Sequence, residues 1–248
     1  MCKGRLAVIA NGVLLLATLF SAGGHATAST DGVGTDRTRY LFPQGERQIG
    51  VTLLNRTKET YLVQAWVREI DAATGDVRNA MTPFFLKQPV LKAMAGGRYG
   101  FQVIQTRPVM IGDRESVYLL SFKLIPSELR PSAAGKNIRA NVVATYNVKL
   151  FYRPDAIKKS TVAAAAKLLK FEWRGKVLHI SNPSPLWLTF SRLDVGGESV
   201  EESALKKMLP PYSSVDFATP ASGRSGSVQW RVLDENGEQT PVLEQVLP

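Results

Sequence analysis

The chain has 248 residues, of which 44% are hydrophobic and 21% are charged. These fractions are those of an ordinary globular protein and exclude the collagen-like, coiled-coil and disordered classes. Lysine and arginine number 31 against 21 acidic residues, a formal net charge of +10, while one cysteine and two histidines exclude an intramolecular disulfide and leave little room for metal or triad chemistry.

The first 28 residues are predicted to be an export signal. Lys3 and Arg5 precede a mostly apolar run at 6–20, and Ala-Thr-Ala at 26–28 offers the small-x-small pattern that signal peptidase reads. The apolar run, at about 15 residues, is short for a membrane span, which needs about 20. We therefore expect cleavage after Ala28, with an uncleaved membrane anchor as the alternative.

The mature chain is predicted to be almost entirely β-strand, because short runs of branched and aromatic residues recur between turn signals. In the first half the predicted strands cover 37–42, 48–55, 61–69, 100–105, 116–125 and 138–152. A short helix is predicted over 161–169. In the second half the predicted strands cover 170–173, 177–181, 186–193, 227–233 and 242–247. Asn-Gly at 236–237 predicts a tight turn after the strand at 227–233.

The boundary between the two halves is predicted near residues 151–159. Arg-Pro-Asp at 153–155 ends the longest predicted strand, and the charged pair Lys158 and Lys159 follows. The fold class expected is all-β, with two immunoglobulin-like β-sandwich domains at 29–152 and 153–248. Because the linker between the two domains is only a few residues long, we expect it to hold them at a fixed angle.

The sequence carries no recognisable catalytic, cofactor or metal motif. His179 lies between Leu178 and Ile180 and is expected to be an outward-facing strand residue rather than a catalytic base. The acidic clusters at 198–202 and 234–238 are expected to be solvated turns. The basic residues are scattered without an aromatic-interleaved stripe, and export disfavours a nucleic-acid partner. We therefore expect no enzyme, no cofactor, no metal, no nucleic acid and no membrane insertion.

Several motifs, in matching order along the chain, resemble the periplasmic chaperones of the chaperone–usher pilus pathway. They read DRTR at 36–39, YLVQAW at 61–66, DRES at 113–116, VKLFYRP at 148–154, SNPSP at 181–185 and MLP at 208–210. The resemblance covers the whole mature chain. It implies a periplasmic protein that folds and caps pilin or fimbrial subunits and delivers them to an outer-membrane usher. Because an exposed apolar strand is an aggregation hazard, we also expect the protein to cap itself, for instance as a homodimer, when no subunit is bound.

The resemblance also implies roles for individual residues. Chaperones of this family lend a strand to a subunit that lacks one, which is donor-strand complementation. Here the strand corresponds to residues 138–150, and its donated face to Ala140, Val142, Ala144, Tyr146 and Val148. Arg39 and Lys149 match the pair that grips the subunit's C-terminal carboxylate. The interdomain ion-pair positions are matched by Glu115, Arg153 and Asp234.

Two alternatives from other classes stay open. One is an exported β-sandwich module that binds carbohydrate or a cell surface, and the other is an exported hydrolase built around His179 or carboxylates alone. Carbohydrate modules place several exposed aromatic side chains on one face. The four tryptophans instead lie in strand patterns expected to be core: Trp66, Trp173, Trp187 and Trp230.

Overall fold

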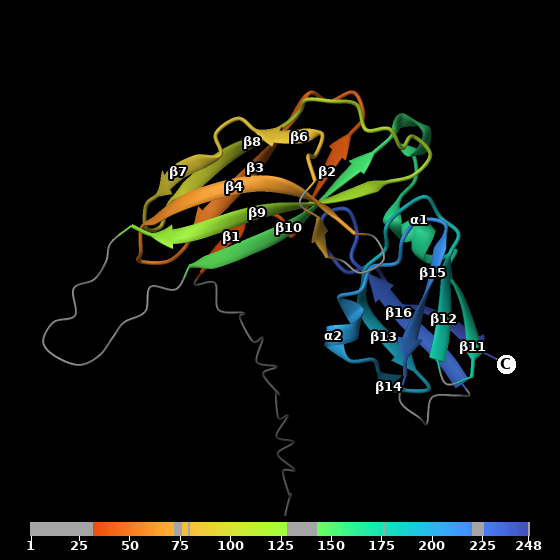
Figure 1. Ribbon diagram of the computed structural model, residues 1–248. Helices are drawn as coiled ribbons and strands as arrows, with labels where there is room; N and C mark the ends of the chain where they lie inside the picture. The colour runs from red at the N-terminus through yellow and green to blue at the C-terminus, as the bar shows by residue number, and fades with distance from the viewer. Residues whose placement is uncertain are drawn as a thin grey trace, which may run out of the picture. The chain divides into compact units, whose positions relative to one another are not determined.

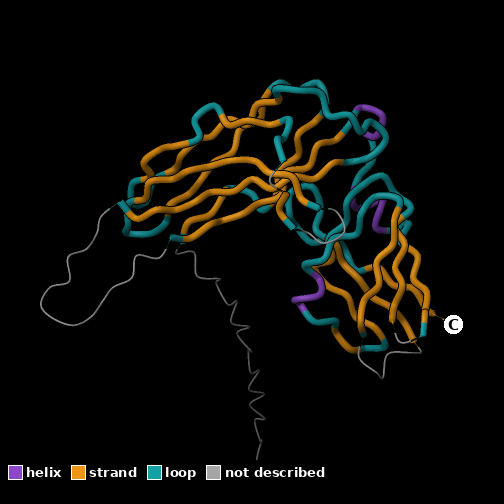
Figure 2. Tube along the Cα trace, viewed as in Figure 1, coloured by secondary structure: helices purple, strands orange, loops and turns teal. Residues whose placement is uncertain are grey.

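The computed structural model describes residues 32–71, 76–78, 80–127, 143–175, 177–219 and 226–247. These residues form two β-sandwiches that belong to one compact unit (Figure 1). Figure 2 shows that strands dominate both sandwiches and that the helices are short. The all-β prediction is confirmed.

The first sandwich consists of two sheets. One has the strand order β1 (Val33–Thr35), β3 (Gln48–Asn55), β8 (Arg98–Gln105) and β6 (Phe84–Leu86). The other has the order β2 (Arg39–Pro43), β10 (Ala144–Arg153), β9 (Ser116–Pro126), β4 (Tyr61–Ile70) and β5 (Val77–Arg78), and β7 (Val90–Ala93) also pairs with β4. Alternate side chains of each strand fill the core between the sheets, as Leu120, Phe122 and Leu124 do on β9.

The second sandwich is built in the same way. One sheet has the strand order β11 (Lys170–Arg174), β12 (Val177–Asn182) and β15 (Ser213–Ala218). The other has the order β14 (Glu198–Ser199), β13 (Phe190–Val195), β16 (Gly226–Val232) and β17 (Leu243–Leu247). The short helices are η1 (Asp155–Ile157), α1 (Val162–Ala166) and α2 (Glu202–Leu205). Within the described part of the chain, none of the helices is long and apolar enough to span a membrane.

Most predicted strands exist, with three informative differences. The apolar run at 186–193 was expected to be one strand, but β13 begins only at Phe190. Its first part is an irregular segment that is buried and held by the Asn182 side chain, which donates to the Leu186 carbonyl at 2.8 Å. Strand β15 was missed because three of its six residues are serine or aspartate. The helix expected at 161–169 spans only Val162–Ala166, capped by the Thr161 hydroxyl.

The outward face of one sheet of the first sandwich is covered at its end by the second sandwich. Val117 and Phe151 point away from the first core and form a separate buried cluster with Trp187 of the second sandwich. Leu41 and Met208 pack against this cluster from the two sides. The same outward face carries the polar residues of the candidate site.

Candidate functional site

The parallel pairing of β2 with β10 brings two distant cations together. Its register places Arg39 directly beside Lys149. The next residues along, Tyr40 and Leu150, lie in the core of the first sandwich. Because side chains alternate along a strand, Arg39 and Lys149 share the opposite, outward face of the sheet.

The Arg39 side chain is held in place and lacks one acceptor. The residue is only 5% exposed. Its Nη1 donates to the Leu233 carbonyl at 3.0 Å, and its guanidinium carbon lies 5.5 Å from the centre of the Phe151 ring. Its Nε is buried without a hydrogen-bond partner among the described residues. A buried donor without an acceptor is costly, so this group suits an incoming anion.

Lys149 carries its charge in an unfavourable setting. Burial, and after it the repulsion from Arg39, lowers the pKa of Lys149 to about 8. No carboxylate of the described residues offsets this shift. Burial also lowers the pKa of Arg39, and the carboxylates of Asp234, Glu115 and Glu235 oppose that effect. Two adjacent cations in a partly dry environment favour the binding of one carboxylate.

Replacing Lys149 by methionine is expected to stabilise the free protein at pH 7. The lysine pKa is lowered from about 10.4 in the unfolded chain to about 8 in the folded protein. The unfolded chain therefore binds more protons between these values, and wild-type stability rises as the pH rises through this window. Because one pKa unit corresponds to about 1.36 kcal/mol, the Lys149→Met variant should gain up to about 3 kcal/mol at pH 7, and this gain should disappear by about pH 10.5.

Chemical denaturation of both proteins between pH 6 and pH 10.5 measures this difference. If the variant is less stable than wild type at pH 7, Lys149 contributes to the stability of the fold. That result would contradict the interpretation that this lysine serves binding at the expense of stability. The matched control is Lys170→Met, which removes an exposed lysine on β11 and should change the free energy of unfolding at pH 7 by no more than about 0.5 kcal/mol.

A second group of charges joins the two sandwiches around Arg153. The Arg153 side chain is 8% exposed, and its Nη2 lies 2.7 Å from Glu115 Oε1. Its Nε donates to the same oxygen at 2.8 Å. From the second sandwich, Glu235 Oε1 lies 3.3 Å from Arg153 Nη1 and accepts the backbone N–H of Val162 at 2.8 Å. Arg153 is thus paired with one carboxylate from each sandwich, Glu115 and Glu235.

Glu115 also forms two hydrogen bonds with Trp187, the tryptophan of the buried cluster between the two sandwiches. Its Oε2 accepts the backbone N–H of Trp187 at 3.0 Å, and its own carbonyl accepts the indole N–H of Trp187 at 3.0 Å. Burial raises the pKa of Glu115, while the charge and hydrogen bond of Arg153 and the Trp187 N–H oppose the rise. Arg153 is therefore the main group that opposes the effect of burial on the pKa of this carboxyl.

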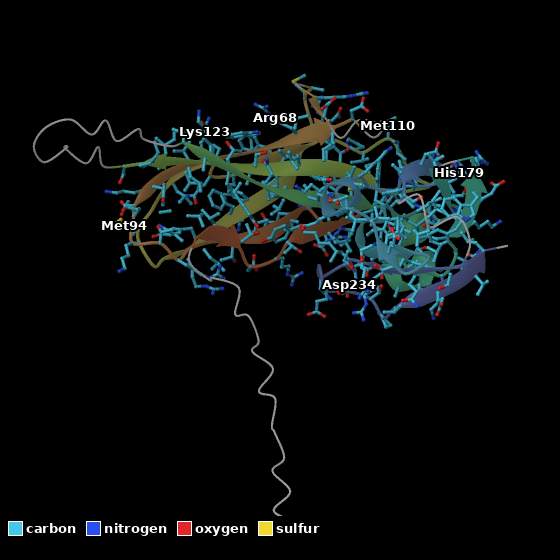
Figure 3. The ribbon with its side chains drawn as sticks, turned by 90° about the horizontal axis from the view of Figure 1, so that it is seen from below. Arg68, Met94, Met110, Lys123, His179 and Asp234 are labelled. Carbon is cyan, nitrogen blue, oxygen red and sulfur yellow. The ribbon has the colours of Figure 1, made fainter. Side chains whose placement is uncertain are left out.

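Asp234 does not take the place in this network that the sequence predicted. Its Oδ1 instead accepts the backbone N–H groups of Asn236 and Glu238, at 2.8 and 2.9 Å. The tight turn expected at Asn-Gly is present, and its geometry directs Asp234 into the turn and the next residue, Glu235, towards Arg153. Figure 3 labels Asp234 and, on another side of the second sandwich, His179. Prediction of Asp234 as the ion-pair partner was therefore wrong by one residue.

Among the described residues, no strand lies beside one edge of β10 over its first half. Residues 144–152 of β10 pair with β9 on one side, whereas β2 occupies the other side only from Lys149 onwards. Over 144–148 that second edge has no partner strand among the described residues. Unpaired backbone N–H and C=O groups of this kind are a template for another extended chain.

The predicted donor residues differ in what the structure shows of them. Ala140 and Val142 lie outside the described residues. Ala144 is exposed, and Tyr146 is half-buried against the first core, its hydroxyl 3.2 Å from that of Thr35. Val148 is only 3% exposed within the first core, so its inclusion in the donated face is contradicted. Its side chain packs in the core between the two sheets of the first sandwich, which accounts for its burial.

His179 and the four tryptophans are the residues on which the two alternative functions would rest. His179 is an outward-facing strand residue, as expected, with its Nδ1 2.6 Å from Asp216 Oδ1. Trp187 and Trp230 are buried, but Trp66 and Trp173 are only half-buried, so the expectation that all four tryptophans are core was too broad. Trp66 lies under the guanidinium of Arg68, at 5.3 Å, which partly covers its ring.

Sequence reasoning missed Glu235, Leu233 and Trp187 as parts of the site. Leu233 acts through its backbone carbonyl, for which no sequence signal exists. Glu235 could have been suspected only as one of several acidic residues in one turn. Trp187 was assigned to an ordinary strand. The apolar run that contains it follows directly after Pro185, and the structure shows that the Pro185 carbonyl accepts the Glu115 N–H at 2.9 Å.

Two models of one protein family match the chain in order. Pili and flagellar-assembly chaperone, PapD N-terminal domain, matches residues 32–158, and Pili assembly chaperone PapD, C-terminal domain, matches residues 164–243. The chaperone protein FimB/FhaD of Bordetella pertussis is 30% identical over 244 residues, which cover 96% of both chains. The chaperone protein LpfB of Salmonella typhimurium is 29% identical over 216 residues, covering 86% of this chain and 88% of that protein.

Solved structures share the fold. A chain in the structure of the Salmonella enterica SafA pilin with the SafB chaperone superposes with a TM-score of 0.74 at 24% identity, covering 89% of this chain and 98% of that one. The Escherichia coli chaperone DraB gives 0.72 at 24% identity, covering 88% and 98%. The family models together span nearly all of the described chain, so the protein belongs to the PapD family of pilus-assembly chaperones.

Proposed function

We propose that this protein is a non-enzymatic periplasmic chaperone that binds, folds and caps pilin or fimbrial subunits and delivers them to an outer-membrane usher. The observation that carries the proposal is the Arg39–Lys149 pair, placed where the free edge of β10 meets β2. Membership of the PapD family supports this function over a carbohydrate-binding module or a hydrolase.

The strand order supports a ligand that is the end of a chain. An extended segment added along residues 144–148 of β10 would run into Arg39, where β2 begins to occupy the same edge. It must therefore stop there. If it runs parallel to β10, as β2 does, its last group is a C-terminal carboxylate beside Arg39 and Lys149. Main-chain bonds would then supply affinity, and the two cations would set the register.

The proposal includes the processing and division of the chain. The first 28 residues would be removed on export to the periplasm, and the mature chain would divide near Arg153 into domains at 29–152 and 153–248. The interval between the two family matches, after residue 158 and before residue 164, supports a division in this region. No ATP is required, because the folding of the subunit and later strand exchange can supply the free energy.

The unpaired edge of β10 also supports self-capping in the absence of a subunit. An exposed strand edge promotes aggregation unless it is covered. A second copy of the chaperone can cover it, which makes a homodimer the expected state of the free protein at high concentration. Binding of a subunit would compete with this dimer.

Placing a charge at Ala144 is expected to abolish subunit binding while leaving the fold intact. Ala144 is exposed, so Ala144→Asp should change the free energy of unfolding by no more than about 0.5 kcal/mol. In the complex the same side chain would enter the apolar groove of the subunit, where desolvating a carboxylate costs several kcal/mol. Co-purification of a pilin from the periplasm, after co-expression with each variant, measures the loss.

The control is Thr145→Asp, at the neighbouring exposed position with the opposite pleat direction. It adds the same charge to the same strand but points away from the face that would enter the groove. Equal retention of the pilin by both variants would exclude this face of β10 as the donated one. Val148→Asp should unfold the first sandwich and is therefore not informative about binding.

A further inference from the structure

A turn of the second sandwich holds the strand that carries Arg39. We refer to residues 233–238 as the 233–238 turn. The Leu233 carbonyl accepts the hydrogen bond of Arg39 Nη1 at 3.0 Å. Gly237 lies so close to Thr38, the residue before Arg39, that a β-carbon added at Gly237 would overlap the Thr38 hydroxyl. The turn therefore contacts both the side chain of Thr38, which precedes Arg39, and the end of the Arg39 side chain.

The shape of this turn is fixed by Asp234 and Gly237. Asp234 Oδ1 accepts two backbone N–H groups of the turn, and the Asp234 N–H donates to the Glu238 carbonyl at 2.8 Å. Gly237 has a φ of 85°, in the left-handed region that other residues adopt at a cost. This use of the Asp234 side chain is distinct from the ion pair around Arg153, to which Glu235 contributes.

We propose that the 233–238 turn is the positioning element of the carboxylate anchor, with Asp234 and Gly237 as positioning residues that act through Arg39. The inference rests on the proposed function and deepens it. An arginine side chain has many rotamers, and fixing it before the ligand arrives lowers the entropy cost of binding. The first sandwich would then depend for its affinity on a turn of the second sandwich.

The test compares alanine at two glycines that share the same backbone conformation. Gly237 and Gly197 both have a φ of 85°. Among the described residues no atom lies within 4 Å of a β-carbon added at Gly197, whereas one added at Gly237 would meet the Thr38 hydroxyl. Both variants therefore carry the same backbone strain, and only Gly237→Ala displaces Thr38. The probe is a synthetic peptide of a pilin's C-terminal strand, and its affinity is measured by calorimetry with the mature chain.

Gly237→Ala is expected to weaken peptide binding about tenfold relative to Gly197→Ala. Adding Thr38→Ala should restore most of the loss, because the overlapping hydroxyl is removed and the remaining Thr38 β-carbon would lie at 3.3 Å. Backbone strain alone cannot be rescued in this way. Equal affinities for the two single variants, or a failed rescue in a folded double variant, would overturn the inference.

A second readout needs no peptide. Nuclear magnetic resonance titration of the Lys149 amino group follows the pKa that Arg39 helps to lower. Displacement of Arg39 in Gly237→Ala should raise the pKa of Lys149, and Gly197→Ala should leave it as in wild type. If the wild type shows the lowered pKa but does not bind the peptide, the proposed function fails. If the pKa is the same in both variants, the positioning role fails and the proposed function stands.

Conservative replacement of Asp234 keeps the proposal testable if Gly237→Ala does not fold. Asp234→Asn retains an oxygen that can accept the two N–H groups of the turn, whereas Asp234→Ala removes it. A role in the turn predicts that alanine weakens peptide binding several-fold more than asparagine does. Equal losses for asparagine and alanine would show that Asp234 acts through its charge, and would contradict the inference.

Discussion

Arg153→Ala is expected to produce the largest loss of stability of any single substitution in the junction between the sandwiches. It leaves Glu115, which is 4% exposed, with the Trp187 N–H as the only remaining partner of its side chain among the described residues. Breaking one side of a buried ion pair costs about 3–5 kcal/mol, because the remaining charge is uncompensated. Glu235 would also lose its Arg153 contact, although its bond to the Val162 N–H remains.

The effect should concentrate at the junction. Each sandwich has a separate core, and Arg153 belongs to neither. We therefore expect an early unfolding transition, faster proteolysis around residues 153–159 and altered solution scattering. Unchanged cleavage kinetics and scattering would show that the network does not hold the two sandwiches together.

The pH dependence gives a sharper check. Burial raises the pKa of Glu115, and Arg153 opposes that rise, so removing Arg153 raises the pKa further. A folded-state pKa above the unfolded value means that the folded protein binds more protons, and stability then falls as the pH rises above about 4.3. The gap between Arg153→Ala and wild type should therefore widen from pH 4 to pH 8.

Two variants serve as controls for this prediction. Arg174→Ala removes an exposed partner of Glu172 and should cost no more than about 0.5 kcal/mol, because exposed ion pairs contribute little. Combining Arg153→Met with Glu115→Gln removes both charges, and should recover part of the stability lost in Arg153→Ala. A double variant as unstable as the single one would mean that shape, not charge, sets the cost.

The strand pattern could be predicted from sequence because it depends on neighbours along the chain. Alternation of apolar and polar residues located β3, β4, β9 and β16 within two residues at each end. It failed at 186–189, where the apolar residues are buried without forming a ladder. It also failed at Ser213–Ala218, where inward-facing Val215 and Phe217 are flanked by small polar residues. Periodicity reports burial of one face, and not whether a partner strand is present.

The site depends on contacts between distant segments, which periodicity does not report. Arg39 and Lys149 meet only because β2 pairs in parallel with β10, and each looks like an ordinary surface charge in the sequence. The resemblance to a family located them, together with Glu115 and Arg153. It could not decide between Asp234 and Glu235, because the backbone turn alone determines which carboxylate faces Arg153. Nor could it show where the core of the first sandwich ends, which decided the burial of Val148.

Lys149→Ala is expected to remove most of the affinity for a subunit while leaving the chaperone folded. The variant loses a charge-assisted bond to a carboxylate that would be shielded from water in the complex. Truncating one partner of such a pair costs about 2–5 kcal/mol, or about thirtyfold to several thousandfold in affinity. The fold should not suffer, because Lys149 is half-buried and has no stabilising carboxylate among the described residues.

The ligand itself supplies the decisive comparison for Lys149→Ala. Calorimetry with the pilin peptide should give a large loss when the peptide has a free C-terminal carboxylate. An amidated peptide should bind wild type weakly and bind Lys149→Ala equally weakly, because the missing charge no longer matters. Arg39→Lys keeps the positive charge but loses the bond to the Leu233 carbonyl, and should bind the free-acid peptide less tightly than wild type. If wild type binds the amidated and free peptides with the same affinity, Arg39 and Lys149 do not anchor a carboxylate, whatever strand addition contributes.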